Sequence, residues 1–276
     1  MSRRLVHFQS SCSAICPGFE EDVTQLRENS LGLSISTQMP LFKGGFTLQG
    51  VGTSTDYRNG AASGTLTYSI PEGATLCRAI LWWNKFSTAS PGSSVTINGT
   101  AFTGDLVGRS GDTCWNTGAK NIVFRRDVSD LITQLSGSLA ITGFPNVRDG
   151  NMMVDSSQGA ALLLIYSSPE GTCTKIDVYD GCVSLADGGT QSYSLALQGA
   201  KASQIGLGVG DGQDFFSDDF RLSGVTIPGS QAYGRDGPFM DAFAVPVEGL
   251  GAIAPLTLST QTFSDCLSWF LAVHGQ

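Results

Sequence analysis

Short runs of β-forming residues, separated by turn residues, constrain this chain more than any other feature. The runs either alternate apolar and polar residues or are apolar throughout, and 35 of the 276 residues are glycine. Such spacing is typical of many short strands joined by tight turns. No alternation of strands with helical segments is present, which excludes a doubly wound parallel sheet. The sequence therefore predicts an all-β fold, an antiparallel two-sheet sandwich of jelly-roll type with an N-terminal arm.

Most of the predicted strands follow residue 45, so we expect an arm or cap over residues 1–44 and one β-sandwich domain over 45–276. Asn98-Gly99 lies between two β-type runs and predicts a hairpin, because both residues tolerate positive φ. A short helix-like patch lies around residues 20–28 in the arm, and within the domain residues 126–135 carry helical spacing and predict one helical turn. The predicted strands are 46–48, 64–70, 77–83, 95–97, 101–107, 139–144, 160–166, 173–179, 192–197, 204–209, 220–227, 241–247, 256–260 and 266–273.

Charge and hydropathy exclude two classes of partner. The net charge is −8 and only 14% of the residues are charged, against roughly 25% in an average soluble domain. A nucleic-acid-binding surface needs clustered Lys and Arg, which this sequence lacks. The most apolar stretch, residues 160–166, has the length of a buried strand and is too short to cross a bilayer. We therefore expect neither a nucleic acid partner nor a transmembrane segment.

Seven cysteines are dispersed along the chain, and none forms a C-x-x-C pair. Dispersed cysteines in a β-rich chain favour disulfides and an oxidising compartment, whereas buried free thiols are the alternative. Cys173 with Cys182, and Cys12 with Cys16, are the closest pairs and the predicted disulfides. The N-terminus has a basic start without the apolar core of a signal peptide. The predicted extracellular or cell-surface location therefore rests on the cysteines.

Catalytic motifs are missing from the sequence. The two histidines, His7 and His274, lie near the termini, where we expect them to be exposed, and no nucleophile elbow, P-loop or zinc motif is present. We predict that the chain has no catalytic residues and is not an enzyme. A glycosidase needs only two facing carboxylates, so a hydrolase stays as a third alternative.

An acidic, glycine-containing stretch over residues 210–219 is the one candidate metal site. Calcium takes six to eight oxygen ligands, which closely spaced aspartates on a turn supply. The predicted calcium ligands are Asp211, Asp214, Asp218 and Asp219; in addition, Asp177, Asp180, Asp236 and Asp241 could reach the same edge. The alternative is that these residues only form turns, with Asp bonding to its own backbone.

Three tryptophans are candidates for binding. Adjacent positions on a strand face opposite sides, so one of Trp82 and Trp83 faces the core, and the other meets a second sheet, a partner or a sugar ring. Trp115 follows a cysteine in a predicted loop and is the candidate ligand-binding residue, although packing is the commoner role of tryptophan.

Several segments in a fixed order resemble a known domain. The series is similar to an uncharacterised β-domain of bacterial and archaeal surface proteins, often placed before adhesin-like repeats. The resemblance covers roughly residues 65–250 and implies an extracellular β-sandwich with a role in surface structure or attachment. Its segments are residues 79–84, 95–100, 112–115, 126–128, 159–166, 178–181, 208–213 and 234–241.

These observations favour a self-assembling structural subunit of a filament, layer or coat. Leu31, Leu33 and Ile35 alternate with polar residues, as in a strand that adds to the sheet of a neighbouring copy; the alternative is pairing within their own domain. A calcium-dependent carbohydrate-binding adhesin module is the second hypothesis.

Overall fold

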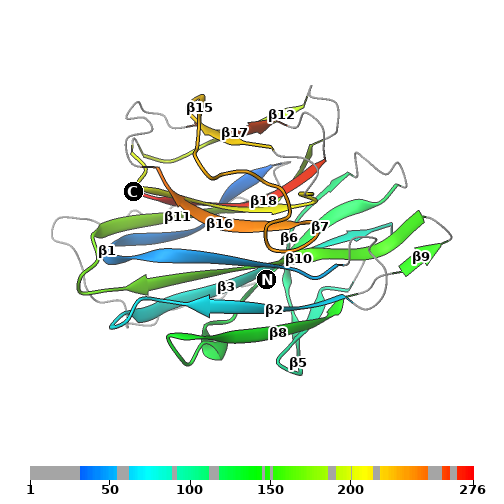
Figure 1. The fold of residues 1–276 in the computed structure, drawn as a ribbon, viewed down its shortest axis with the longest axis horizontal. Coiled ribbons are helices and arrows are strands. Elements are labelled where there is room, and N and C mark those ends of the chain that lie inside the picture. Colours follow the sequence, from blue (N-terminus) through cyan, green and yellow to red (C-terminus); the bar gives the residue numbers. More distant parts are fainter. Residues whose placement is uncertain are drawn as a thin grey trace, which may run out of the picture.

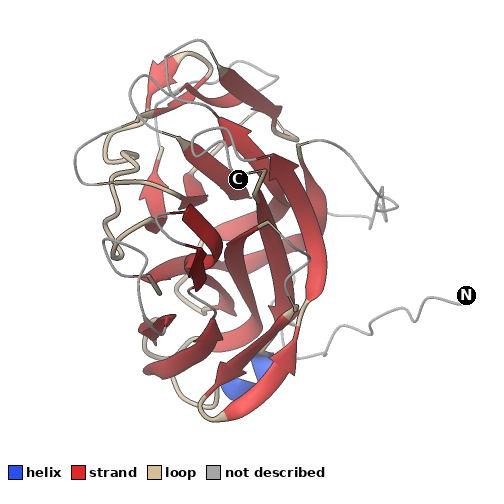
Figure 2. Cartoon of the chain, turned by 90° about the vertical axis from the view of Figure 1, so that its right-hand side faces the viewer, coloured by secondary structure: helices blue, strands red, loops and turns tan. Residues whose placement is uncertain are grey.

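The structure is a computed structural model. It describes residues 32–54, 62–88, 92–111, 118–144, 147–149, 152–185, 191–199, 201–213, 218–247, 257–261 and 266–276. Apart from one 3-10 turn, η1 (Ser129–Leu131), the regular elements of these residues are strands (Figure 2). Among them, no helix is long and apolar enough to cross a membrane.

One large antiparallel sheet forms the centre of the molecule (Figure 1). Its strands, in spatial order, are β16 (Met240–Pro246), β13 (Gln204–Gly210), β18 (Leu267–Gly275), β11 (Cys173–Leu185), β1 (Leu33–Gly52), β10 (Met152–Ser167), β3 (Thr75–Ser87), β7 (Lys120–Asp127) and β6 (Asp105–Gly111), with β9 (Val147–Asp149) paired to β10.

Two smaller antiparallel sheets lie on opposite sides of the large sheet, at the top and bottom of Figure 1. One consists of β12 (Ser192–Ala196), β17 (Thr257–Gln261), β14 (Phe220–Leu222) and β15 (Val225–Thr226), in that order. The other consists of β2 (Ala62–Ser69), β8 (Ser136–Phe144), β4 (Ser94–Ile97) and β5 (Thr100–Thr103). The predicted all-β, antiparallel, jelly-roll-like fold is confirmed, with three sheets among the described strands where the sequence predicted two.

The large sheet curls so that both of its ends fold over the same face. At one end, a side chain at Gly108 of β6 would meet the backbone of β11 at Gly181. At the other end, one at Gly50 of β1 would meet Ala242 of β16. The face enclosed in this way buries an apolar cluster that includes Phe42, Phe46, Trp82, Phe270 and Leu271.

Two further apolar clusters join the large sheet to its smaller neighbours. Trp269 of β18 packs edge-on against Phe220 of β14, and Trp83 of β3 lies in the cluster that includes Leu66 of β2. Trp82 and Trp83 face opposite sides of β3, and both are fully buried because each face of this strand is covered by an apolar cluster. Neither is left to meet a sugar or a partner, so packing accounts for both.

Local signals explain the confirmed elements. Asn98 and Gly99 have φ values of 48° and 83° and join β4 to β5 in a hairpin, as predicted. The helical prediction for residues 126–135 holds only over Ser129–Leu131, because β7 continues to Asp127 by pairing with Ile80 of β3. Ser129 Oγ then donates to Asp127 Oδ1 (2.6 Å) at the corner.

The segment predicted to reach a neighbouring copy is a strand within its own chain. Leu33 pairs with Gly181 and Ile35 with Tyr179, both on β11. β1 runs without interruption from Leu33 to Gly52, across the predicted boundary between residues 44 and 45. The alternative of intramolecular pairing therefore holds for Leu33 and Ile35, whereas Leu31 lies outside the described residues.

Candidate functional site

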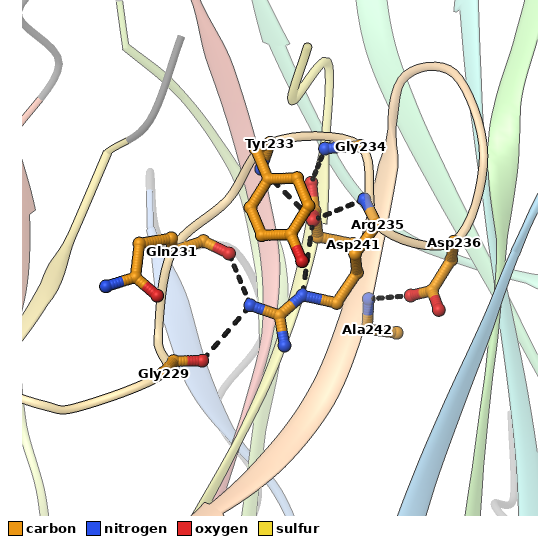
Figure 3. A network of polar contacts seen from close by, with 8 residues as sticks. All are labelled: Gly229, Gln231, Tyr233, Gly234, Arg235, Asp236, Asp241 and Ala242. Atoms are coloured by element: carbon orange, nitrogen blue, oxygen red, sulfur yellow. Dashed lines mark hydrogen bonds and ion pairs between the residues drawn. The ribbon is translucent and has the colours of Figure 1, made fainter. Parts of the chain in front are cut away.

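The loop between β15 and β16 is organised around one buried carboxylate (Figure 3). Asp241, near the start of β16, is fully buried. It accepts hydrogen bonds from the backbone N–H groups of Tyr233 (3.1 Å), Gly234 (2.8 Å) and Arg235 (2.9 Å). Successive N–H groups turned toward one anion form a nest that stabilises negative charge. This carboxylate therefore fixes the conformation of the loop that precedes its own strand.

Arg235 ties the same loop together from the opposite direction. Its Nη2 donates to the carbonyl oxygens of Gly229 (3.1 Å) and Gln231 (2.5 Å), and its Nε lies 3.5 Å from Asp241 Oδ1. The guanidinium carbon lies 3.6 Å from the centroid of the Phe243 ring, which makes a cation–π contact. Arg235 thus neutralises Asp241 and links both halves of the loop.

Asp236 docks this loop on the end of β1. Its Oδ2 accepts a hydrogen bond from Ala242 N (2.6 Å), and its carbonyl oxygen accepts one from Gly52 N (2.7 Å). A side chain at Gly50 would overlap the Asp236 carboxylate, so the close approach requires glycine there. Burial, together with the nearby charge of Asp241, raises the pKa of Asp236 to about 6, against the lowering effects of the Ala242 hydrogen bond and Arg235.

The chemistry that this loop offers is structural. Both carboxylates accept hydrogen bonds from backbone N–H groups, which anchors them within the loop. Tyr233 is exposed in this loop, at 42%, and the Arg235 guanidinium carbon lies 5.2 Å from the centroid of its ring. The loop is therefore a fixed surface feature. Sequence reasoning included Asp236 and Asp241 as aspartates that could reach the predicted calcium edge, covered 234–241 through the resemblance, and assigned Arg235 no role.

The predicted calcium ligands are divided between described and undescribed parts of the chain. Asp211 is buried at a positive φ of 69°, and its N–H donates to Phe239 O (3.0 Å). Asp218 bridges to Ala232 through its backbone, whereas Asp214 lies outside the described residues. Among the residues that the structure places, no group of three or more His, Cys, Asp or Glu side chains is arranged to hold a metal ion. The calcium site stays a prediction.

Two other aspartates on β11 do not converge on this loop. Asp177 accepts a hydrogen bond from Gln38 Nε2 (2.9 Å) and pairs with Lys175 Nζ (3.3 Å). Asp180 accepts hydrogen bonds from Trp82 Nε1 (3.0 Å) and Arg125 Nη1 (2.7 Å). Each of the two is held by partners on its own part of the large sheet, and none of these contacts joins it to Asp241.

The predicted disulfide between Cys173 and Cys182 is wrong. Cys182 is a free, buried thiol, and its Sγ lies 2.9 Å from Ser110 Oγ. Cys77, Cys173 and Cys266 are each disulfide-bonded. The other predicted pair, Cys12 with Cys16, and the candidate ligand residue Trp115 lie outside the described residues, so both remain predictions.

His274 is not the exposed residue that its position near the terminus predicts. It lies on β18, between β11 and β13, and is fully buried, with Nε2 2.9 Å from Lys201 O. Burial lowers its pKa. Because β18 is an interior strand of the sheet, closeness to the terminus implies no exposure here.

Comparison with known proteins assigns no family to the chain. No family model matches it, and no curated protein matches it either. Among solved structures, it is similar to PBCV-1 VP54, described as a crystal structure fitted into a cryo-EM reconstruction of the virophage Sputnik. The identity is 9%, the match covers 92% of this chain and 95% of that one, and the TM-score is 0.22. This weak likeness carries no argument about function.

Proposed function

We propose that this chain is a structural subunit of an extracellular coat, layer or filament, which joins neighbouring copies through the edges of its two smaller sheets. The observation that carries the proposal is the chemistry of those edges. The four edge strands contain no charged residue; they are β2 (ASGTLTYS), β5 (TAFT), β12 (SYSLA) and β15 (VT).

Monomeric proteins usually protect sheet edges with charges, proline, bulges or covering segments. The large sheet follows this rule, since its edge strand β6 carries Asp105 and Arg109 and packs against β11. Its other edge strand, β16, ends at Pro246 and packs against β1. In the smaller sheets, β2 likewise packs against β1, since a side chain at Gly64 would meet Val51, so strand addition is favoured at their other edge strands.

The positions of β5 and β12, one edge strand from each smaller sheet, support a repeating assembly. Thr100, Ala101 and Thr103 of β5 are exposed, as are Ser192, Ser194 and Ala196 of β12. The sheets that contain them lie on opposite sides of the molecule (Figure 1). Contacts at two different surfaces can propagate through many copies, whereas one self-complementary surface closes a dimer.

The proposed location outside the cell rests on the half-cystines. Disulfides persist in oxidising compartments and are rare in the cytosol, and Cys77, Cys173 and Cys266 are disulfide-bonded. Thiol counting on protein purified without reductant tests this point. Reactive thiols at all three positions after denaturation would contradict it.

A charge placed on one edge tests the proposed assembly. Light scattering coupled to size exclusion is measured on the wild type and on Ala101→Lys in β5 and Ser194→Lys in β12. The wild type is expected to form large species. Each variant is expected to form them only at a protein concentration at least about tenfold higher, because Lys opposes edge pairing. Ser138→Lys on the interior strand β8 is the matched control, exposed in the same sheet as Ala101. Equal loss in the control, or a monomeric wild type, would overturn the proposal.

A further inference from the structure

One end of the enclosed face of the large sheet is polar. On three strands, the inward-facing side chain next to an apolar one is polar. Asn84 follows Trp82 on β3, Asn121 precedes Val123 on β7, and Ser184 follows Cys182 on β11. Side chains two positions apart share a face of a strand. All three rows therefore become polar where β3 and β11 end and β7 begins.

These polar side chains form a connected network. Asn84 Nδ2 donates to Gln158 Oε1 and to Ser268 Oγ (3.0 Å). Cys182 Sγ lies 3.7 Å from Ser268 Oγ and connects this group to Ser110. Ser110 also joins Asn121 to the network: Asn121 Nδ2 donates to Ser184 Oγ (2.9 Å), which lies 2.6 Å from Ser110 Oγ.

Three amide atoms in this network have no hydrogen-bond partner among the described residues. They are Asn84 Oδ1, Asn121 Oδ1 and Gln158 Nε2. Asn84 and Gln158 are fully buried, and Asn121 is 4% exposed. Buried polar atoms in folded proteins nearly always have a partner, either protein or bound solvent, so these three atoms require one.

The network sets the chemistry of that partner. Two of the unmatched atoms are acceptors and one is a donor, so the partner must both donate and accept hydrogen bonds. None of the described contacts of the network involves a charged side chain, which disfavours an ion. β13 also approaches closely, because a side chain at Gly210 would overlap Gln158 and Asn84. A neutral group that both donates and accepts hydrogen bonds fits the chemistry of such a site.

We propose that the polar end of the enclosed face is a binding site for neutral hydroxyl groups, held by Asn84, Asn121 and Gln158. Water and the hydroxyl of a polyol or sugar share this chemistry. A hydroxyl between Gln158 Nε2 and Asn84 Oδ1 would accept from the first and donate to the second. The same reasoning applies to Asn121 Oδ1, which would accept a hydrogen bond from a hydroxyl.

A high-resolution crystal structure of the wild-type chain, grown without polyols and then soaked in glucose, tests the site. We expect density peaks about 3 Å from Asn84 Oδ1, Gln158 Nε2 and Asn121 Oδ1. Peaks that stay separate in the soaked crystals identify water, and continuous density for a sugar ring identifies a carbohydrate. Either result supports the site. Absence of density beside all three atoms in both crystals overturns it.

A variant measures the role of the amide directly. Gln158→Met keeps the approximate length of the side chain but removes both its N–H donor and the Oε1 that accepts from Asn84 Nδ2, so the peak that Gln158 Nε2 holds is expected to be lost. Ser138→Ala, on the exposed face of β8, should leave all peaks in place. If Gln158→Met does not fold, the wild-type density alone decides. Because the site is independent of the sheet edges, its failure would leave the proposed assembly untouched.

Discussion

The Asp241 loop and the polar end of the enclosed face both bury polar groups, but they satisfy them to different degrees. Asp241 accepts three backbone hydrogen bonds, and Arg235 Nε lies 3.5 Å from its Oδ1 in an ion pair without a hydrogen bond. By contrast, the amides of Asn84, Asn121 and Gln158 each leave one atom unmatched within the described chain. The comparison separates a region built for rigidity from one that needs a further partner.

Charge explains why the two regions differ. A buried carboxylate without partners costs several kcal/mol, so a fold that keeps Asp241 must surround it with donors. A neutral amide with one unmatched atom costs only about 1–3 kcal/mol, and a small hydroxyl can remove that cost. The same reasoning ranks the effects of substitutions in the two regions.

Replacing Asp241 should have the largest effect. Asp241→Ala removes the acceptor of three N–H groups and leaves Arg235 without its counter-charge, so we expect the free energy of unfolding to fall by about 3–5 kcal/mol. Chemical denaturation measures it. Asp130→Ala, at an exposed position of η1, should change stability by less than about 0.5 kcal/mol. A similarly small effect at Asp241 would show that the loop does not depend on its carboxylate.

Asp236 should give the loop a pH dependence of stability. Because its pKa is raised from 3.8 to about 6 in the folded state, the folded chain binds more protons than the unfolded chain does between pH 3.8 and pH 6. The resulting contribution to the free energy of unfolding is present below pH 4 and is lost as the pH rises through 6, and it amounts to about 3 kcal/mol. Asp236→Asn should remove it and be the more stable protein above pH 6.

The pH profile has to be read as the difference between wild type and Asp236→Asn. His274 contributes with the opposite sign, since its lowered pKa makes stability fall as the pH drops below 6.5. Both proteins contain His274, so its contribution cancels in the difference. A difference that does not vary between pH 4 and 7 would contradict the role assigned to Asp236.

Arg235→Lys should have an intermediate effect. Lysine keeps the charge near Asp241 but cannot reach both Gly229 O and Gln231 O while stacking on Phe243. We expect a loss of about 1–2 kcal/mol in the free energy of unfolding. Stability equal to the wild type would mean that charge alone, without the planar group, holds the loop.

Asn121→Leu, in the polar end, should have the smallest effect, because it removes a neutral group. The expected loss is about 1 kcal/mol, the value of a typical hydrogen bond. Thermal or chemical denaturation, run beside Asp241→Ala, compares the two regions directly. A loss as large as that of Asp241→Ala would contradict the ranking.

Local signals in the sequence were sufficient for much of the fold. Asn98-Gly99 predicted its hairpin because a two-residue turn depends on two backbone conformations. The apolar run of residues 160–166 predicted the C-terminal half of β10, because a run of this length is typical of a strand buried on both faces. Such signals depend on neighbouring residues alone.

The sequence did not predict the strands correctly where polar residues are buried. β10 begins at Met152, but its part with Ser156, Ser157 and Gln158 was not predicted, although all three are fully buried. A polar run indicates a loop unless its long-range partners are known, and those of Gln158 and Asn121 lie on distant strands. For the same reason Arg235 and Asp241 could not be recognised as a pair around a loop.

Electron microscopy of the purified wild-type chain at increasing concentration tests the proposed role of the protein most directly. The account predicts ordered particles, filaments or layers in which β5 or β12 of one copy continues the sheet of the next. Isolated single subunits at every concentration, or contacts that leave all edges of the smaller sheets unpaired, would contradict it.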